Sequence, residues 1–106
     1  MKYVTPYERW GFSLAQWESL ALLTARVEKA GIAVTGINNL QDNDPTAGAE
    51  LIYSRGKQAI MLTVSSRSGK AVLSFHKNFD SAAPQRVCQG DLAAWDNLAS
   101  QMIFFH

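Results

Sequence analysis

Residues 49–76 show the clearest alternation of hydrophobic and polar positions in the chain. The apolar residues that share one face of its three runs are Ala49, Leu51 and Tyr53, then Ile60, Leu62 and Val64, and finally Ala71, Leu73 and Phe75. Because successive side chains alternate across a strand, this period of two indicates half-buried strands. Two basic turns, Arg55-Gly56-Lys57 and Arg67-Ser68-Gly69-Lys70, separate the runs, and their glycines suit hairpin turns. The stretch predicts an antiparallel meander.

A helical pattern precedes the meander. Ser13-Leu14-Ala15-Gln16 has the form of a capping box, and Gly31 is a natural helix stop. One long helix is therefore predicted from about residue 14 to residue 30. Its stripe at helical spacing consists of Trp17, Leu20, Thr24 and Val27, widened by Ala21 and Leu23. Thr5-Pro6-Tyr7-Glu8 predicts a short helix before it, ending near Gly11.

The remaining segments predict one more strand and one more helix. Alternation over Ile32–Leu40 indicates a strand, and Gln41–Gly48 is expected to be a polar loop. Arg86–Gln89 is a candidate for a short fifth strand, which the pattern leaves open. Asp91 is expected to cap a final helix. The buried stripe predicted for that helix is Leu92, Trp95, Leu98 or Ala99, Met102 and Phe105.

The order helix, four antiparallel strands, helix predicts an α+β fold. We expect a two-layer sandwich in which a four-stranded antiparallel meander carries the long N-terminal helix and the C-terminal helix on one face. A length of 106 residues fits a single α+β domain spanning residues 1–106. The alternative is a more curved sheet that wraps around the long helix.

Composition narrows the classes of partner. The net charge is +1, which gives no global attraction to nucleic acid or to a membrane. Proteins that bind single-stranded nucleic acid on a sheet interleave aromatic and basic residues on its exposed face. The outer face expected here, with Ala59, Met61 and Thr63, lacks them, which disfavours nucleic-acid binding. No apolar run approaches about 18 residues, and the N-terminus lacks the apolar core of a signal peptide. We therefore expect a cytoplasmic protein that does not act in a membrane.

The sequence contains no motif that identifies an enzyme. Phosphate-loop, dinucleotide, nucleophile-elbow and zinc-protease patterns all fail to match. Cys88 is the single cysteine, so it forms no internal disulfide and no multi-thiolate zinc site. Cys88 with His76 as its base is one conceivable nucleophile–base combination, and nothing in the sequence places the two together. We predict no catalytic residue, no metal site and no cofactor.

Basic residues are expected to gather at one end of the sheet. A meander sends alternate turns to opposite ends, and the long helix would end beside one set of them. The residues predicted at that end are Arg26, Lys29, Arg55, Lys57 and Lys77. One hypothesis is that this end binds an anionic partner, and the simpler alternative is a set of ordinary solvated turns.

Aromatic residues gather near both ends of the chain. Tyr7 and Trp10 flank Arg9, a composition typical of interface centres, although covering a core edge would explain it too. Phe104 and Phe105 would point about 100° apart on a helix, so one of them is exposed unless another chain covers it. These features suggest a homodimer formed through the final helix or the N-terminal segment.

The leading hypothesis for function is a non-enzymatic small interaction protein. It would bind a macromolecular partner, either an unidentified protein or a second copy of itself. The alternative is a small-ligand-binding protein with a pocket between the long helix and the sheet. The residues expected to line that pocket are Trp17, Tyr53 and Phe75.

Overall fold

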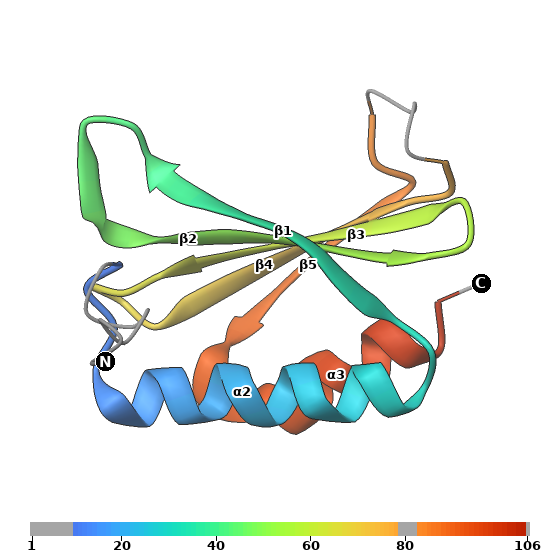
Figure 1. Cartoon of the computed structure of the whole chain (residues 1–106), viewed down its shortest axis with the longest axis horizontal. Coiled ribbons are helices and arrows are strands. Elements are labelled where there is room, and N and C mark those ends of the chain that lie inside the picture. The colour runs from blue at the N-terminus through green and yellow to red at the C-terminus, as the bar shows by residue number, and fades with distance from the viewer. Residues whose placement is uncertain (1–9, 79–82, 106) are drawn as a thin grey trace, which may run out of the picture.

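A computed structural model describes residues 10–78 and 83–105 and shows a five-stranded sheet above two helices (Figure 1). In chain order the elements are α2 (Leu14–Lys29), β1 (Ala33–Gln41), β2 (Asp44–Arg55), β3 (Gln58–Ser65), β4 (Lys70–His76), β5 (Arg86–Asp91), a 3₁₀ turn (Leu92–Ala94) and α3 (Trp95–Ile103). All strand pairs are antiparallel, in the order β1-β2-β3-β4-β5. The predicted α+β class with an antiparallel sheet and two helices is confirmed.

The long helix begins and ends where its sequence predicts. The Gln16 amide donates to the Ser13 hydroxyl at 3.1 Å, and the Ser13 amide donates to the Gln16 side chain at 2.8 Å. These two bonds form the capping box and satisfy amide groups that lack partners within the helix. Gly31 follows the helix with a φ of 88°, a conformation that glycine adopts without strain. The short helix predicted near residue 5 lies largely outside the described residues.

The core lies between the sheet and the two helices. All nine residues that the alternation assigned to one face of the meander are at most 3% exposed. They stack across the strands in register, as in the row Leu51, Leu62 and Leu73. The helices add Leu20, Leu23 and Val27 from α2 and Leu98, Ala99 and Met102 from α3. Burying each large aliphatic side chain contributes about 1.5–3 kcal/mol, so this layer is the main source of stability.

The prediction of a four-stranded sheet is wrong, because the candidate fifth strand at Arg86–Gln89 forms and, as β5, pairs with β4. Arg86, Cys88 and Gly90 occupy its inward positions, opposite Phe75, Leu73 and Ala71. An arginine, a cysteine and a glycine do not produce an apolar period of two. The one large apolar residue, Val87, points outward and is 52% exposed. The strand therefore forms through pairing with β4 rather than through a pattern of its own.

The expected polar loop at Gln41–Gly48 is also wrong. β1 extends to Gln41 and β2 begins at Asp44, which leaves a two-residue turn between them. The β3–β4 turn stabilises the start of β2, because the Ser66 amide in that turn donates to the Ala47 carbonyl at 3.1 Å. Arg67 in the β3–β4 turn also forms an ion pair with Asp44. Contacts far apart in the sequence thus convert a polar stretch into strand.

The C-terminal helix packs beside α2. Its predicted stripe is confirmed in Leu92, Leu98, Ala99, Met102 and Phe105, which are buried, whereas Trp95 is half-buried. Asp91 occupies the cap position of the 3₁₀ turn without a side-chain cap bond. Arg26 of α2 forms an ion pair with Asp96 and donates to the Ser100 hydroxyl at 3.0 Å. In the described part of the chain, neither helix is long and apolar enough to cross a membrane.

Candidate functional site

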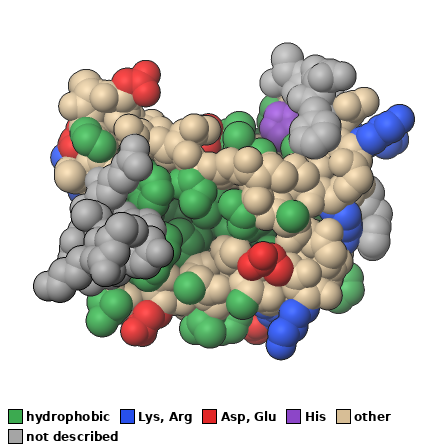
Figure 2. Space-filling model, viewed as in Figure 1, with side chains coloured by type: hydrophobic (Ala, Val, Ile, Leu, Met, Phe, Trp, Pro, Cys, Tyr) green, Lys and Arg blue, Asp and Glu red, His purple; other side chains and the backbone are tan. Residues whose placement is uncertain are grey.

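An open apolar hollow of about 300 Å³ lies between α2 and β1. We call it the α2–β1 groove. Figure 2 shows hydrophobic side chains gathered in a hollowed region between α2 and the sheet. The lining residues are Trp17, Leu20, Ala21, Thr24, Ala25 and Glu28 from the helix, with Val34, Ile37 and Leu51 from the strands. Its walls therefore come from one helix and the first two strands.

The groove exists because α2 divides its apolar residues between two directions. Successive residues rotate by about 100° around a helix, so Leu20 and Val27 point into the core while Ala21 and Glu28 point toward β1. Ala21 and Ala25 are small and exposed, which keeps the helix wall recessed. The stripe predicted from helical spacing thus contributes both to the core and to the groove wall.

Thr24, which lines the groove, contacts the buried Tyr53. The Thr24 hydroxyl lies 2.9 Å from the hydroxyl of Tyr53, and they share a hydrogen bond. Burial raises the pKa of Tyr53 to about 12, and the nearby Glu28 carboxylate adds to this rise. The phenol is therefore neutral near neutral pH.

Of the three residues expected to line a ligand pocket, one faces an open hollow. Trp17 lines the α2–β1 groove. Tyr53 and Phe75 are both 0% exposed and belong to the core. Phe75 packs against Phe105 with ring centroids 4.9 Å apart, and the Arg86 guanidinium lies 5.3 Å from its ring centre. The structure does not bring these three side chains together around one cavity.

The five residues predicted at the basic end differ in what they contact. Arg26 holds α2 to α3 through Asp96 and Ser100. Arg55 donates to the carbonyl of Ile103, the last residue of α3, and to that of Phe105 just beyond the helix. The remaining three, Lys29, Lys57 and Lys77, are exposed. Two of the five cations thus contribute to packing within the molecule.

We expect Arg55→Met to lower the free energy of unfolding by about 2 kcal/mol. The substitution keeps an apolar stem but removes charge-assisted hydrogen bonds to two carbonyls. Such a bond contributes about 1.5–3 kcal/mol when it is buried, and because Arg55 is half-buried, water replaces part of what the two bonds contribute. Lys57→Met, in the same turn and exposed, should change stability by less than about 0.5 kcal/mol. Urea denaturation of both variants measures the difference, and equal effects would show that Arg55 does not secure the C-terminal segment.

The aromatic residues singled out in the sequence have separate environments. Trp10 is 7% exposed, and its indole N–H donates to the Asn39 side chain at 2.9 Å. Phe104 is 73% exposed whereas Phe105 is 6% exposed, so the two rings point to different sides as helical spacing predicts. Tyr7 and Arg9 lie outside the described residues. Phe104 is the most exposed large apolar side chain of the described part.

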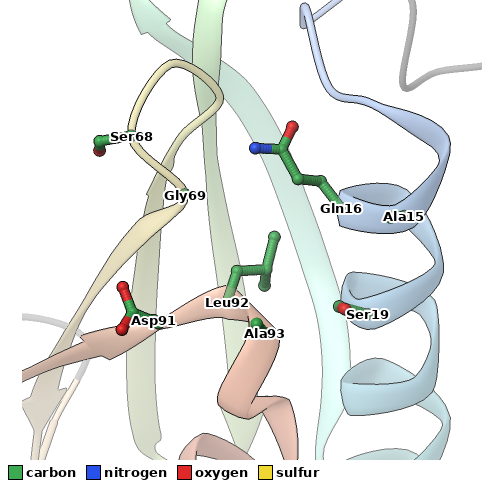
Figure 3. A pocket seen from close by; sticks show the side chains of 8 residues that line it. All are labelled: Ala15, Gln16, Ser19, Ser68, Gly69, Asp91, Leu92 and Ala93. Atoms are coloured by element: carbon green, nitrogen blue, oxygen red, sulfur yellow. The ribbon is translucent and has the colours of Figure 1, made fainter.

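A second hollow of about 270 Å³ lies at the N-terminal end of α2 (Figure 3). The Gln16 side chain extends from the helix toward the β3–β4 turn and donates to the Ser66 carbonyl at 2.9 Å. The Leu92 amide donates to the Gly69 carbonyl at 2.8 Å. These bonds join α2, the β3–β4 turn and the start of the C-terminal helix, so we assign this region a structural role.

Cys88 and His76 do not form a nucleophile–base pair. Cys88 lies opposite the buried Leu73 and points inward, whereas His76 follows the buried Phe75 and points outward. The Cys88 thiol donates to the Gln101 side chain at 2.9 Å, and burial raises its pKa, which disfavours the reactive thiolate. Within residues 10–78 and 83–105, no group of three or more His, Cys, Asp or Glu side chains could hold a metal ion.

Comparisons with protein-family models, with curated proteins and with solved structures found no match for this chain. Its function is therefore argued from its own geometry.

Proposed function

We propose that this chain is a non-enzymatic interaction protein that binds a segment of a partner protein in the α2–β1 groove. The observation that supports this is an apolar hollow that no other described element fills, with Ile37 41% exposed on one wall. Concave apolar surface of this kind is energetically unfavourable in water unless something covers it. A partner segment would bury it.

The shape and chemistry of the groove favour a polypeptide over a small ligand. Small-molecule sites enclose most of the ligand and present several convergent polar groups. This groove is open, and besides Trp17 the residues with polar side chains that line it are Thr24 and Glu28. Thr24 already shares a hydrogen bond with Tyr53, so the groove offers little to orient a small polar molecule.

Ala21→Glu is expected to block partner binding. Ala21 lies within the groove, and a glutamate there would place an additional charge against a desolvated apolar segment. We expect affinity capture from the native host's lysate at near-physiological salt, read by mass spectrometry, to recover one stoichiometric partner with the natural chain. Recovery should fall at least about tenfold with Ala21→Glu, which corresponds to about 1.4 kcal/mol.

Ala15→Glu is the matched control for this experiment. Ala15 is exposed on the same helix and points about 120° away from Ala21, so the same substitution there leaves the groove open. Recovery should be unchanged with this variant. Equal recovery with all three chains would contradict the proposal. A small molecule that copurifies with the natural chain in native mass spectrometry and is lost with Ala21→Glu would support the ligand alternative instead.

A further inference from the structure

β1 forms an edge of the sheet that carries no charged residue and no proline. Among the described residues it pairs with β2 on one side alone, so about half of its backbone amides and carbonyls point outward. Sheet edges are commonly guarded by charged residues or proline. The other edge strand, β5, carries Arg86 and Asp91, whereas the nine residues of β1 include no charged residue and no proline. β1 is therefore open to pairing with another strand.

A short central part of β1 has the regular geometry that such pairing requires. Irregularities in register fall between Val34 and Gly36 and between Asn39 and Gln41. Between them, Gly36–Asn39 pair without interruption with Ile52–Ala49 of β2. An added strand would centre on this stretch, because bulges disrupt the ladder on either side. The bulges also limit how much strand can be added.

The regular stretch of β1 lies directly beside the α2–β1 groove. Ile37 is in register with Leu51, and both residues line the groove. Alternate side chains of a strand point to the same face. In a strand added to β1, every second side chain would therefore enter the space over Ala21 and Ala25, where the helix wall is recessed. The other side chains would lie on the outer face of the sheet, next to Asn38.

Acidic groups lie on both faces of this stretch. Glu28 lines the groove on the inner face. Glu50 is in register with Asn38 and lies on the outer face, between the buried Ala49 and Leu51. The nearest arginine of α2, Arg26, is held by Asp96 on the side of the helix that faces α3. Electrostatic complementarity therefore favours lysine or arginine in the bound segment.

We propose that the partner segment binds as an extended strand added to the free edge of β1, with apolar residues at alternate positions in the α2–β1 groove and basic residues beside Glu28 and Glu50. This inference rests on the proposed function. It follows a recognised mode of peptide binding, in which backbone pairing supplies affinity and pockets for alternate side chains supply specificity. A second copy of the chain fits less well, because its own β1 has no basic residue to meet these carboxylates.

A displayed library of random linear peptides, selected against the whole chain, provides the probe. We expect selected peptides to alternate apolar residues with polar ones and to be rich in lysine and arginine. Each selected peptide is then synthesised with backbone N-methyl groups on alternate residues, in either of the two phases. One phase should weaken binding at least tenfold and the other should have little effect, because only every second amide of an added strand faces β1.

Carboxylate variants test the charge argument. Glu28→Gln and Glu50→Gln should each weaken binding of the selected peptides several-fold and reduce its dependence on salt. Asp91→Asn, on the opposite edge strand, is the matched control and should change neither quantity. Acidic selected peptides, or equal effects of the three variants, would overturn the assignment of a basic partner.

The outcomes separate this inference from the proposed function. If both N-methyl phases weaken binding equally, strand addition is overturned. In that case a loss of partner recovery with Ala21→Glu would still support the proposed function. If no selected peptide binds the Ala21→Glu variant more weakly than the natural chain, the inference is overturned. A dimer in sedimentation that Ile37→Lys dissociates would identify a second copy as the occupant and would also overturn it.

Discussion

Gly48→Ala is expected to lower the free energy of unfolding by about 3–4 kcal/mol. Gly48 has a φ of 143°, a conformation that L side chains rarely adopt. A Cβ atom at this position would lie 2.0 Å from the carbonyl oxygen of Val64 on the neighbouring strand. Backbone strain alone costs about 1–3 kcal/mol. The remainder comes from separating β2 and β3, because the clashing atom is backbone and cannot rotate away.

Gly56→Ala provides the matched control. Gly56 also has a positive φ, 59°, but an added Cβ there meets nothing within 4 Å. Its substitution should cost about 1 kcal/mol from conformational strain alone. For a domain of about this size each 1 kcal/mol lowers Tm by about 4–8 °C, so thermal unfolding resolves the two variants. Similar losses for both would show that the two strands do not approach closely at Gly48.

The parts of the fold that could be predicted are those with a strong local pattern. Three strands of the meander each bury one complete face, so their period of two is visible in the sequence. The long helix has its own start and stop signals in the Ser13–Gln16 capping box and Gly31. In both cases the residues that form the element also carry the signal for it.

The parts that the sequence left open or predicted wrongly depend on distant contacts. Arg86, Cys88 and Gly90 lie on the inward side of β5. This segment forms a strand because it pairs with the edge strand β4. The start of β2 is strand because the β3–β4 turn supports it through Ser66 and Arg67. No local periodicity marks either segment. Such strands can be predicted only once the position of the neighbouring strand is known.

Of the predicted pocket residues, Trp17 alone lines the α2–β1 groove, and the position of the groove beside β1 was not predicted, for a related reason. Spacing shows which residues of a helix share a face, but not how far the helix lies from each strand of the sheet. Trp17 and Thr24 fit a core stripe as well as they fit a groove wall. Two signals were nevertheless present in the sequence. Small residues, Ala21 and Ala25, continue the stripe toward the acidic Glu28, and the strand that follows the helix has no charge over its whole length.

The stability of this protein is expected to fall steeply above pH 10 because of Tyr53. Burial raises the pKa of Tyr53 from 10.0 to about 12, so the phenol ionises at lower pH in the unfolded chain than in the folded one. The unfolded state therefore releases its proton first as pH rises. The stabilisation is complete below pH 10.0 and is lost between pH 10.0 and about 12. Its full size is about 2–3 kcal/mol, since one pKa unit corresponds to 1.36 kcal/mol.

Tyr53→Phe isolates this contribution. The variant keeps the buried ring but lacks the ionisable hydroxyl, and it leaves Thr24 without its partner at 2.9 Å. We expect it to be about 1 kcal/mol less stable than the natural chain at neutral pH and to lose less stability on going above pH 10.0. Urea unfolding of both chains on either side of that pH provides the measurement. Parallel decreases would mean that Tyr53 ionises as readily in the folded state as in the unfolded one.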